Sequence, residues 1–339
     1  MSSSFCQPAR RQLLRMAAAL PASGMLATLG ALPRTALAAN FPDRPVKFIV
    51  PFGAGGNVDG VGRLLGAAMG PALGQPVVVD NRAGAGGTLG AGVVAQGPAD
   101  GLTLLVGSNG PLTINPFVQA KMPYDPLKDL APIALVGFVP HVLIAATNFP
   151  AKNLQELIAL SKKQDVACSS SGIGSATQLT LERFKAQAGA RITHVPYRGG
   201  SSLVPDLLSG IVPLASMEFS TALPLHKAGK ARILAVAGAQ RSPLAPDLPT
   251  FIDAGVAGFT AQSFVGLLAP ARTPADILRK LEATAVASIG TPEMAERLKG
   301  LGLQVASPKE RTAAGFGEFL RTDYERSREA VKLAGIEPE

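Results

Sequence analysis

Three Gly-containing loops, two of which also carry hydroxyl side chains, hold the residues of this chain best suited to binding chemistry. The loops, 51–59, 169–177 and 195–201, each lie between a predicted strand and a predicted helix start. Glycines in such a loop let backbone N–H groups point at a ligand, and a helix N-terminus adds partial positive charge. This favours an anion, particularly a carboxylate. For any one loop the alternative is a plain turn, but three in two halves of one chain predict a carboxylate held in a cleft between the halves.

Sequence motifs of catalysis and cofactor binding are missing. The segment 84–90 imitates a dinucleotide fingerprint, but Leu89 stands where the third glycine belongs. No G-x-S-x-G is present, because Val106 occupies the first position of the run that ends at Gly110. None of the three histidines has metal-ligand spacing to another or to a cysteine. We therefore predict no catalytic residue, no metal site and no cofactor.

The net charge of the 339-residue chain is concentrated at its beginning. Residues 1–38 hold four of the arginines and no acid, so the formal charge of +8 falls to +4 without them. The rest has no long basic run, which argues against a nucleic-acid partner. A hydrophobic share of 47% excludes a disordered chain.

The first 38 residues have the pattern of a secretory signal peptide. An apolar stretch from Met16 to Leu32 follows the arginines, and a small-x-small cleavage pattern ends at Ala38. The adjacent Arg10 and Arg11 also suit twin-arginine export, and an uncleaved membrane anchor is the alternative. Cleavage would leave Cys168 as the only thiol, which we expect to be a buried hydrophobe.

Short β-branched runs alternate with helical patterns along the rest of the chain. We predict strands that include 46–50, 76–80, 102–106, 143–146, 166–169, 193–196 and 233–237. Near the C-terminus, the hydroxyls of Thr273, Thr291 and Ser307 each precede a Pro and predict helix N-caps. The alternation predicts an α/β fold with a largely parallel sheet.

The chain resembles a known family, the Bug receptors of tripartite tricarboxylate transporters. The resemblance covers the whole chain after the signal peptide. The motifs that carry it are Phe41-Pro42-Asp43-Arg44-Pro45, the segments 50–59, 80–87, 171–175 and 194–200, and Arg241-Ser242-Pro243 with the residues up to Thr250.

The resemblance implies a type 2-like periplasmic binding protein: two α/β lobes with mixed, mostly parallel sheets, joined by a double-crossover hinge. Lobe 1 would comprise 39–139 and 263–339, and lobe 2 would comprise 140–262. The implied ligand-binding residues are Gly55, Gly56, Asn57, Asp59, Ser108, Asn109, Ser171, Gly174, Ser175, Thr177, Tyr197 and Arg198. One departure concerns Met217-Glu218, where the family usually has Asp-Asn. Met217 would make the cleft wall more apolar and favour a carboxylate without an amine.

The resulting prediction is a monomeric periplasmic receptor of a Gram-negative bacterium, not an enzyme. It would bind a small organic carboxylate and deliver it to the membrane subunits of a tripartite transporter. The alternatives are a carboxylate sensor that feeds a membrane signalling protein and an exported α/β hydrolase.

Overall fold

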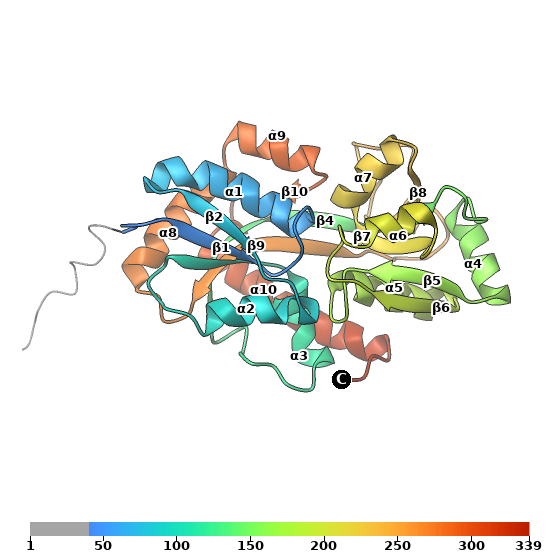
Figure 1. The fold of residues 1–339 in the computed structure, drawn as a ribbon, viewed down its shortest axis with the longest axis horizontal. Helices are drawn as coiled ribbons and strands as arrows, with labels where there is room; N and C mark the ends of the chain where they lie inside the picture. Colours follow the sequence, from blue (N-terminus) through green and yellow to red (C-terminus); the bar gives the residue numbers. More distant parts are fainter. Residues whose placement is uncertain (1–40, 339) are drawn as a thin grey trace, which may run out of the picture. The chain divides into compact units, whose positions relative to one another are not determined.

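The computed structural model describes residues 41–338, so the predicted signal peptide lies outside the described residues. The strands form two connected sheets (Figure 1). Sheet A contains β1, β2, β3, β9, β10 and the first part of β4, and sheet B contains β5–β8 and the last part of β4. The strand bounds are β1 Val46–Val50, β2 Val77–Asn81, β3 Thr103–Gly107, β4 Leu130–Ala146, β5 Val166–Ser170, β6 Ile192–Pro196, β7 Leu214–Glu218, β8 Ala231–Val236, β9 Gln262–Pro270 and β10 Gln304–Val305.

The chain crosses between the two sheets twice. The long strand β4 pairs with β9 as far as Pro140 and with β7 from His141 onward. The chain returns to sheet A in β9. Strands β1–β3 pair in parallel, as do β5–β7, and every antiparallel pairing of the described strands involves β4 or β9. The predicted mixed α/β fold with a double crossover is confirmed, whereas the exact lobe boundaries stay a prediction.

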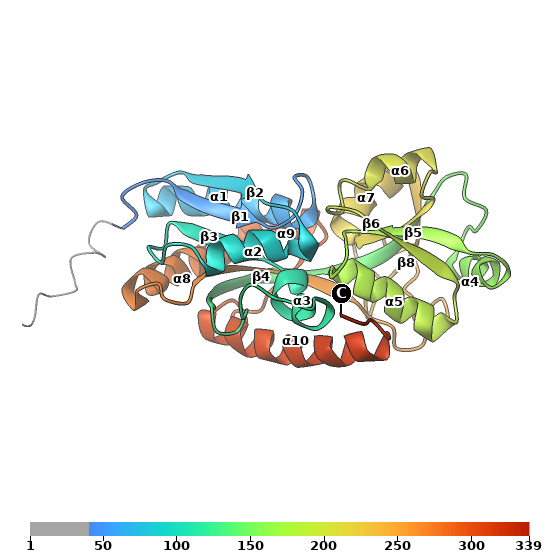
Figure 2. The ribbon, with the colours of Figure 1, turned by 60° about the horizontal axis from the view of Figure 1, so that its bottom comes forward.

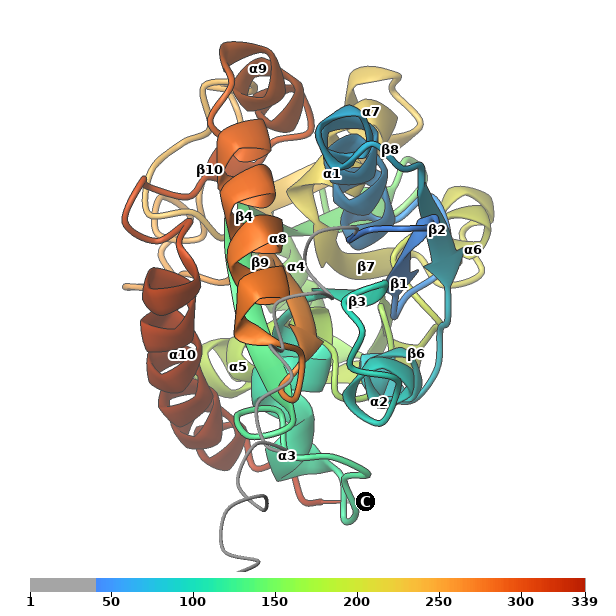
Figure 3. The same cartoon turned by 90° about the vertical axis from the view of Figure 1, so that its left-hand side faces the viewer.

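Helices cover both faces of the sheets. Their bounds are α1 Asn57–Leu73, α2 Thr88–Ala95, α3 Asn115–Val118, α4 Leu154–Lys163, α5 Ala176–Ala188, α6 Val204–Ser209, α7 Phe219–Lys227, α8 Ala275–Ile289, α9 Pro292–Gly300 and α10 Ala313–Leu333, with short turns η2 at Ala85–Gly87 and η3 at Gly110–Ile114. Helices α1 and α8 pack on one face of sheet A, and α2 and α10 pack on the other (Figure 3). Helix α10 contacts β4, η3 and also α5, so it reaches from the sheet A part to the sheet B part (Figure 2).

Apolar periodicity explains these helices. In α1, Val58, Val61, Leu65 and Met69 recur at helical spacing and are buried against β1 and β3. Burial of four such side chains stabilises the helix by about 1.5–3 kcal/mol each. Gly74 ends α1 in the left-handed conformation, with φ of 71°.

The structure confirms only some of the predictions for Cys168 and for the helix N-caps. Cys168 is fully buried, as predicted, and burial raises the pKa of its thiol. Thr291 caps α9 as predicted, by accepting a hydrogen bond from the Met294 N–H. Thr273 makes no cap bond, because α8 begins after Pro274. Ser307 accepts from the Glu310 N–H, but α10 begins only at Ala313, with Thr312 as its cap. None of the helices described combines the length and apolar character that a membrane crossing requires.

Candidate ligand-binding site

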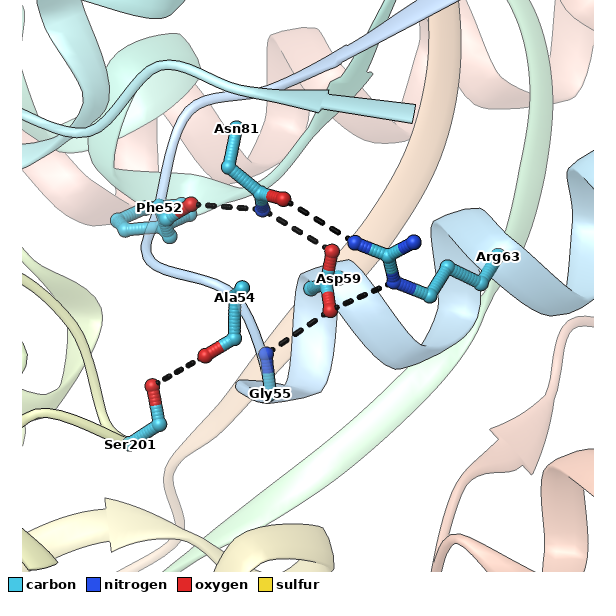
Figure 4. Close-up of polar contacts among 7 residues, drawn as sticks. All are labelled: Phe52, Ala54, Gly55, Asp59, Arg63, Asn81 and Ser201. Carbon is cyan, nitrogen blue, oxygen red and sulfur yellow. Dashed lines mark hydrogen bonds and ion pairs between the residues drawn. The ribbon is translucent and has the colours of Figure 1, made fainter. Parts of the chain in front are cut away.

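The first Gly-rich loop connects β1 to the N-terminus of α1. Gly55 has a φ of 79°, a conformation that side-chain-bearing residues rarely adopt. Its N–H donates to Asp59 Oδ2 at 2.9 Å, and Arg63 Nε donates to the same oxygen at 3.0 Å. Asn81 Nδ2 donates to Asp59 Oδ1 at 3.0 Å (Figure 4). The Asp59 carboxylate therefore fixes the shape of the loop.

The electrostatics of Asp59 follow from these contacts. Burial raises the pKa of Asp59, but hydrogen bonds from Arg63, Gly55 and Asn81 outweigh burial and lower it overall. A carboxyl group whose pKa is lower in the folded than in the unfolded protein contributes stability above its unfolded pKa of about 3.9. That contribution is lost as the pH falls through the folded pKa.

We expect Asp59→Asn to lower the free energy of unfolding by about 1–3 kcal/mol at pH 7, because it breaks buried hydrogen bonds to a charged group. The difference from the wild type should shrink below about pH 4, where the wild-type carboxylate also becomes neutral. Chemical denaturation across a pH series measures both. Asp165→Asn is the control, since Asp165 is exposed and lies 3.8 Å from Arg191. A pH-independent loss in Asp59→Asn would contradict this account.

The second loop connects β5 to the N-terminus of α5. Thr177 Oγ1 accepts from the Ser171 N–H at 3.0 Å and lies 3.0 Å from Ser175 Oγ. Ser175 also caps α5 by accepting from the Gln178 N–H. The loop thus uses its own hydroxyls to present the helix N-terminus and Ser171 toward the first loop.

The two loops enclose a cavity between the sheet A and sheet B parts. Ser201 Oγ donates to the Ala54 carbonyl at 2.7 Å, and Ser220 Oγ donates to Asn57 Oδ1 at 3.1 Å across the same gap (Figure 4 shows the first bond). The cavity has a volume of about 20 Å³, which exceeds the ~10–15 Å³ that one water needs. It is lined by Phe52, Gly56, Asn57, Val58, Ser108, Gly110, Ser171, Ser175, Ala176, Gly200, Glu218 and Ser263.

Two buried polar atoms in this lining have no hydrogen-bond partner within the described chain. They are Asn57 Nδ2, at the start of α1, and Ser171 Oγ, in the loop before α5. Both residues are only 6% exposed. A buried polar group without a partner costs about 1–3 kcal/mol, and a ligand that accepts its hydrogen bond would remove that cost. Both can donate a hydrogen bond, and one comes from each side of the cavity.

The cavity contains some of the predicted site residues but not others. Gly56, Asn57, Ser108, Ser171 and Ser175 line it. The other seven predicted residues, Gly55, Asp59, Asn109, Gly174, Thr177, Tyr197 and Arg198, are not part of its lining.

Asn109, Tyr197 and Arg198 lie outside the lining and have different surroundings. Asn109 accepts from the Phe264 N–H and donates to Asp323. The Tyr197 hydroxyl donates to Asp206, and this hydrogen bond raises the pKa of Tyr197 to about 12. Arg198 is exposed, and its carbonyl oxygen approaches Gly53. The side chains of Asn109 and Tyr197 therefore stabilise neighbouring elements.

Glu218 and Ser263 line the cavity and are absent from the predicted site. They lie at the end of β7 and the beginning of β9, two strands that the sequence did not indicate. The expectation that Met217 faces the cleft is wrong. Successive strand residues point to opposite faces, and Met217 is fully buried in the apolar core, whereas Glu218 lines the cavity. At the position where the family usually has Asn, this chain therefore has an acid, Glu218, in the cavity wall.

The sequence model of one family, described as "Tripartite tricarboxylate transporter family receptor", matches residues 61–335. The chain belongs to this family. Three solved structures of similar proteins agree with the assignment. The periplasmic binding protein BugD is 34% identical, with a TM-score of 0.84 over 88% of this chain and 100% of that one. Rpa4515 from R. palustris with adipate is 33% identical, with a TM-score of 0.84 over 88% and 100%.

The third structure is MatC from Rhodopseudomonas palustris with bound malate. It is 33% identical, with a TM-score of 0.82 over 86% of this chain and all of that one. These likenesses show that the chain is a member of the Bug family and has the fold of a two-lobed periplasmic binding protein. The observed double crossover between sheets A and B is the connection between the lobes.

Proposed function

We propose that this receptor binds a small organic carboxylate in the cavity between its two Gly-rich loops and makes no covalent change to it. The observation that carries the proposal is the pair of unpartnered buried donors, Asn57 Nδ2 and Ser171 Oγ, in one cavity. The N-termini of α1 and α5 flank them and add partial positive charge. A carboxylate has acceptor oxygens for both donors. The carboxylates named for Rpa4515 and MatC support the same class of ligand.

The family description names a transporter receptor, which supports a transporter partner. We propose that residues 1–38 direct export to the periplasm of a Gram-negative bacterium and that the receptor acts as a monomer. The membrane subunits of a tripartite transporter would receive the ligand. The second candidate role, a sensor that reports to a membrane signalling protein, would use the same cavity.

Two serine–histidine pairs bear on the hydrolase alternative, Ser170 with His194 and Ser263 with His141. Of these four residues only Ser263 lines the cavity. Ser263 Oγ lies 2.7 Å from His141 Nε2. However, burial lowers the pKa of His141 to about 3, far from the pKa near 7 that suits a general base. Its other nitrogen lies 2.6 Å from Thr180 Oγ1 instead of a carboxylate. The Ser263–His141 pair is therefore better suited to structure and binding than to nucleophilic catalysis.

A thermal-shift screen tests the proposal. Purified protein is heated with propionate, lactate, alanine, succinate, malate, aspartate, adipate or citrate, each at a series of concentrations. A ligand at one hundred times its Kd should stabilise the fold by about 2.7 kcal/mol, and an ester panel should not be hydrolysed. No stabilisation by any of these acids would overturn the proposed function, as would ester turnover that is lost in Ser263→Ala.

A further inference from the structure

The cavity lining also contains residues that can accept hydrogen bonds, besides the donors Asn57 and Ser171. These residues are Ser263 and Glu218. The inference drawn from them rests on the proposed function, because it concerns the second group of the same carboxylate ligand.

A buried network fixes which way the Ser263 proton points. Thr180 Oγ1 donates to the Ala176 carbonyl at 2.9 Å, so it can only accept from His141 Nδ1, 2.6 Å away. His141 is neutral and then carries its proton on Nδ1, which leaves Nε2 as an acceptor. Ser263 Oγ, 2.7 Å from Nε2, must donate to it. This assignment forms all three hydrogen bonds, whereas the other tautomer forms only two.

The consequence for the cavity is that Ser263 offers lone pairs and no proton. The hydroxyl proton is committed to His141, so Ser263 Oγ can only accept from a ligand. His141 is therefore a positioning residue that sets the polarity of Ser263.

Glu218 adds a carboxyl group to the same lining. It is opposite His141 in the β4–β7 pairing, so the two side chains lie on the same face of sheet B. A Cβ atom on Gly200 would lie 3.1 Å from Glu218 Oε2, which places the carboxyl group close to the loop backbone. Burial raises the pKa of Glu218, and no cation of the described chain contributes to lowering it. A hydrogen bond from its own backbone lowers the pKa in part, and a donor from the ligand would give the carboxyl group a further partner.

We propose that the ligand carries a hydrogen-bond donor, a hydroxyl or an ammonium group, next to its carboxylate, and that Ser263 and Glu218 accept from it. Asn57 and Ser171 would hold the carboxylate. The receptor thus selects 2-hydroxy or 2-amino acids over the matching acid without that group.

Two matched sets of probes test the proposal by isothermal titration calorimetry. One set is propionate, lactate and alanine, and the other is succinate, malate and aspartate. In the set that binds, the hydroxy or the amino acid should bind at least about tenfold more tightly than its deoxy analogue, because a hydrogen bond in a buried site discriminates by that order. Which of the two binds better tells the hydroxyl from the ammonium.

Variants assign the selectivity to its residues. Ser263→Ala and Glu218→Leu should each reduce the preference severalfold and leave the Kd of the deoxy acid almost unchanged. Ser201→Ala is the matched control, because it removes the bond to Ala54 across the gap and should change all three affinities by the same factor. In wild-type protein, ¹⁵N chemical shifts should place the His141 proton on Nδ1.

The outcomes separate this inference from the proposed function. If none of the eight acids of the thermal-shift screen binds, the proposed function fails and the inference falls with it. If adipate alone binds, the proposed function stands and the inference is wrong. If acids bind but the deoxy member binds as tightly as the others, the inference alone is wrong, and proton uptake on binding would then identify Glu218 as a donor to the ligand. A preference that survives in both variants, or a His141 proton on Nε2, would also overturn it.

Discussion

Replacing Ser171 with Ala is expected to stabilise the unliganded receptor and weaken its ligand binding. The two effects have opposite signs because Ser171 Oγ is buried in the cavity wall without a partner in the described chain. Removing an unsatisfied buried hydroxyl relieves a desolvation cost of about 1–3 kcal/mol. The same hydroxyl is proposed to donate to the ligand carboxylate, and a hydrogen bond to a charged group contributes about 1.5–3 kcal/mol. The Kd should therefore rise about 10-fold to 150-fold.

Ser169→Ala is the matched control for this experiment. Ser169 is also fully buried and lies two residues earlier, but its hydroxyl donates to the Leu214 carbonyl at 3.2 Å and does not line the cavity. We expect this variant to lose stability, because it leaves a buried carbonyl without that donor, and to keep its affinity. Chemical denaturation and calorimetry give the two readouts. A Ser171→Ala protein that binds like the wild type would remove Ser171 from the site.

The predicted loops were found where the sequence placed them because strand ends and helix starts have local signals. Runs such as 46–50 and 166–169 are mostly apolar and lead into segments rich in Gly or Ser, so their strands agree with the structure within about one residue. The Gly-rich segments that follow then have to lie at the carboxyl ends of those strands. Sequence alone was therefore sufficient to place these loops in the fold.

Glu218 and Ser263 line the cavity but are not among the predicted site residues. They lie on strands that the sequence pattern did not indicate. Strand β4 contains Pro132 and Pro140, which interrupt a strand pattern, and its pairing with β9 shifts register twice. Strand β7 alternates between small, polar and apolar residues and ends in Glu218. Glu218 and Ser263 reach the cavity only because the long crossing strands bring the two sheets together. That is a tertiary relationship, and no local spacing encodes it.

Closure of the two loops should depend on the absence of a side chain at Gly174. This residue has a φ of 75°, and a Cβ atom there would lie 1.9 Å from Asn115 Oδ1, in the sheet A part. Asn115 cannot move aside easily, because its Nδ2 donates to Thr88 Oγ1 at 2.7 Å and its side chain is fully buried. Overpacking of this kind costs about 1–3 kcal/mol. We therefore expect Gly174→Ala to weaken ligand binding by about 5-fold to 150-fold.

The other end of the same helix provides a control for the backbone conformation. Gly189, the C-cap of α5, has a φ of 61°, and a Cβ atom there would have nothing within 4 Å. Gly189→Ala should thus lose a similar amount of stability, about 1–2 kcal/mol, from the left-handed conformation alone and keep its affinity. If Gly174→Ala bound as tightly as Gly189→Ala, the loops would not need to approach each other for binding. Closure of the two lobes around the ligand would then be the wrong mechanism for this receptor.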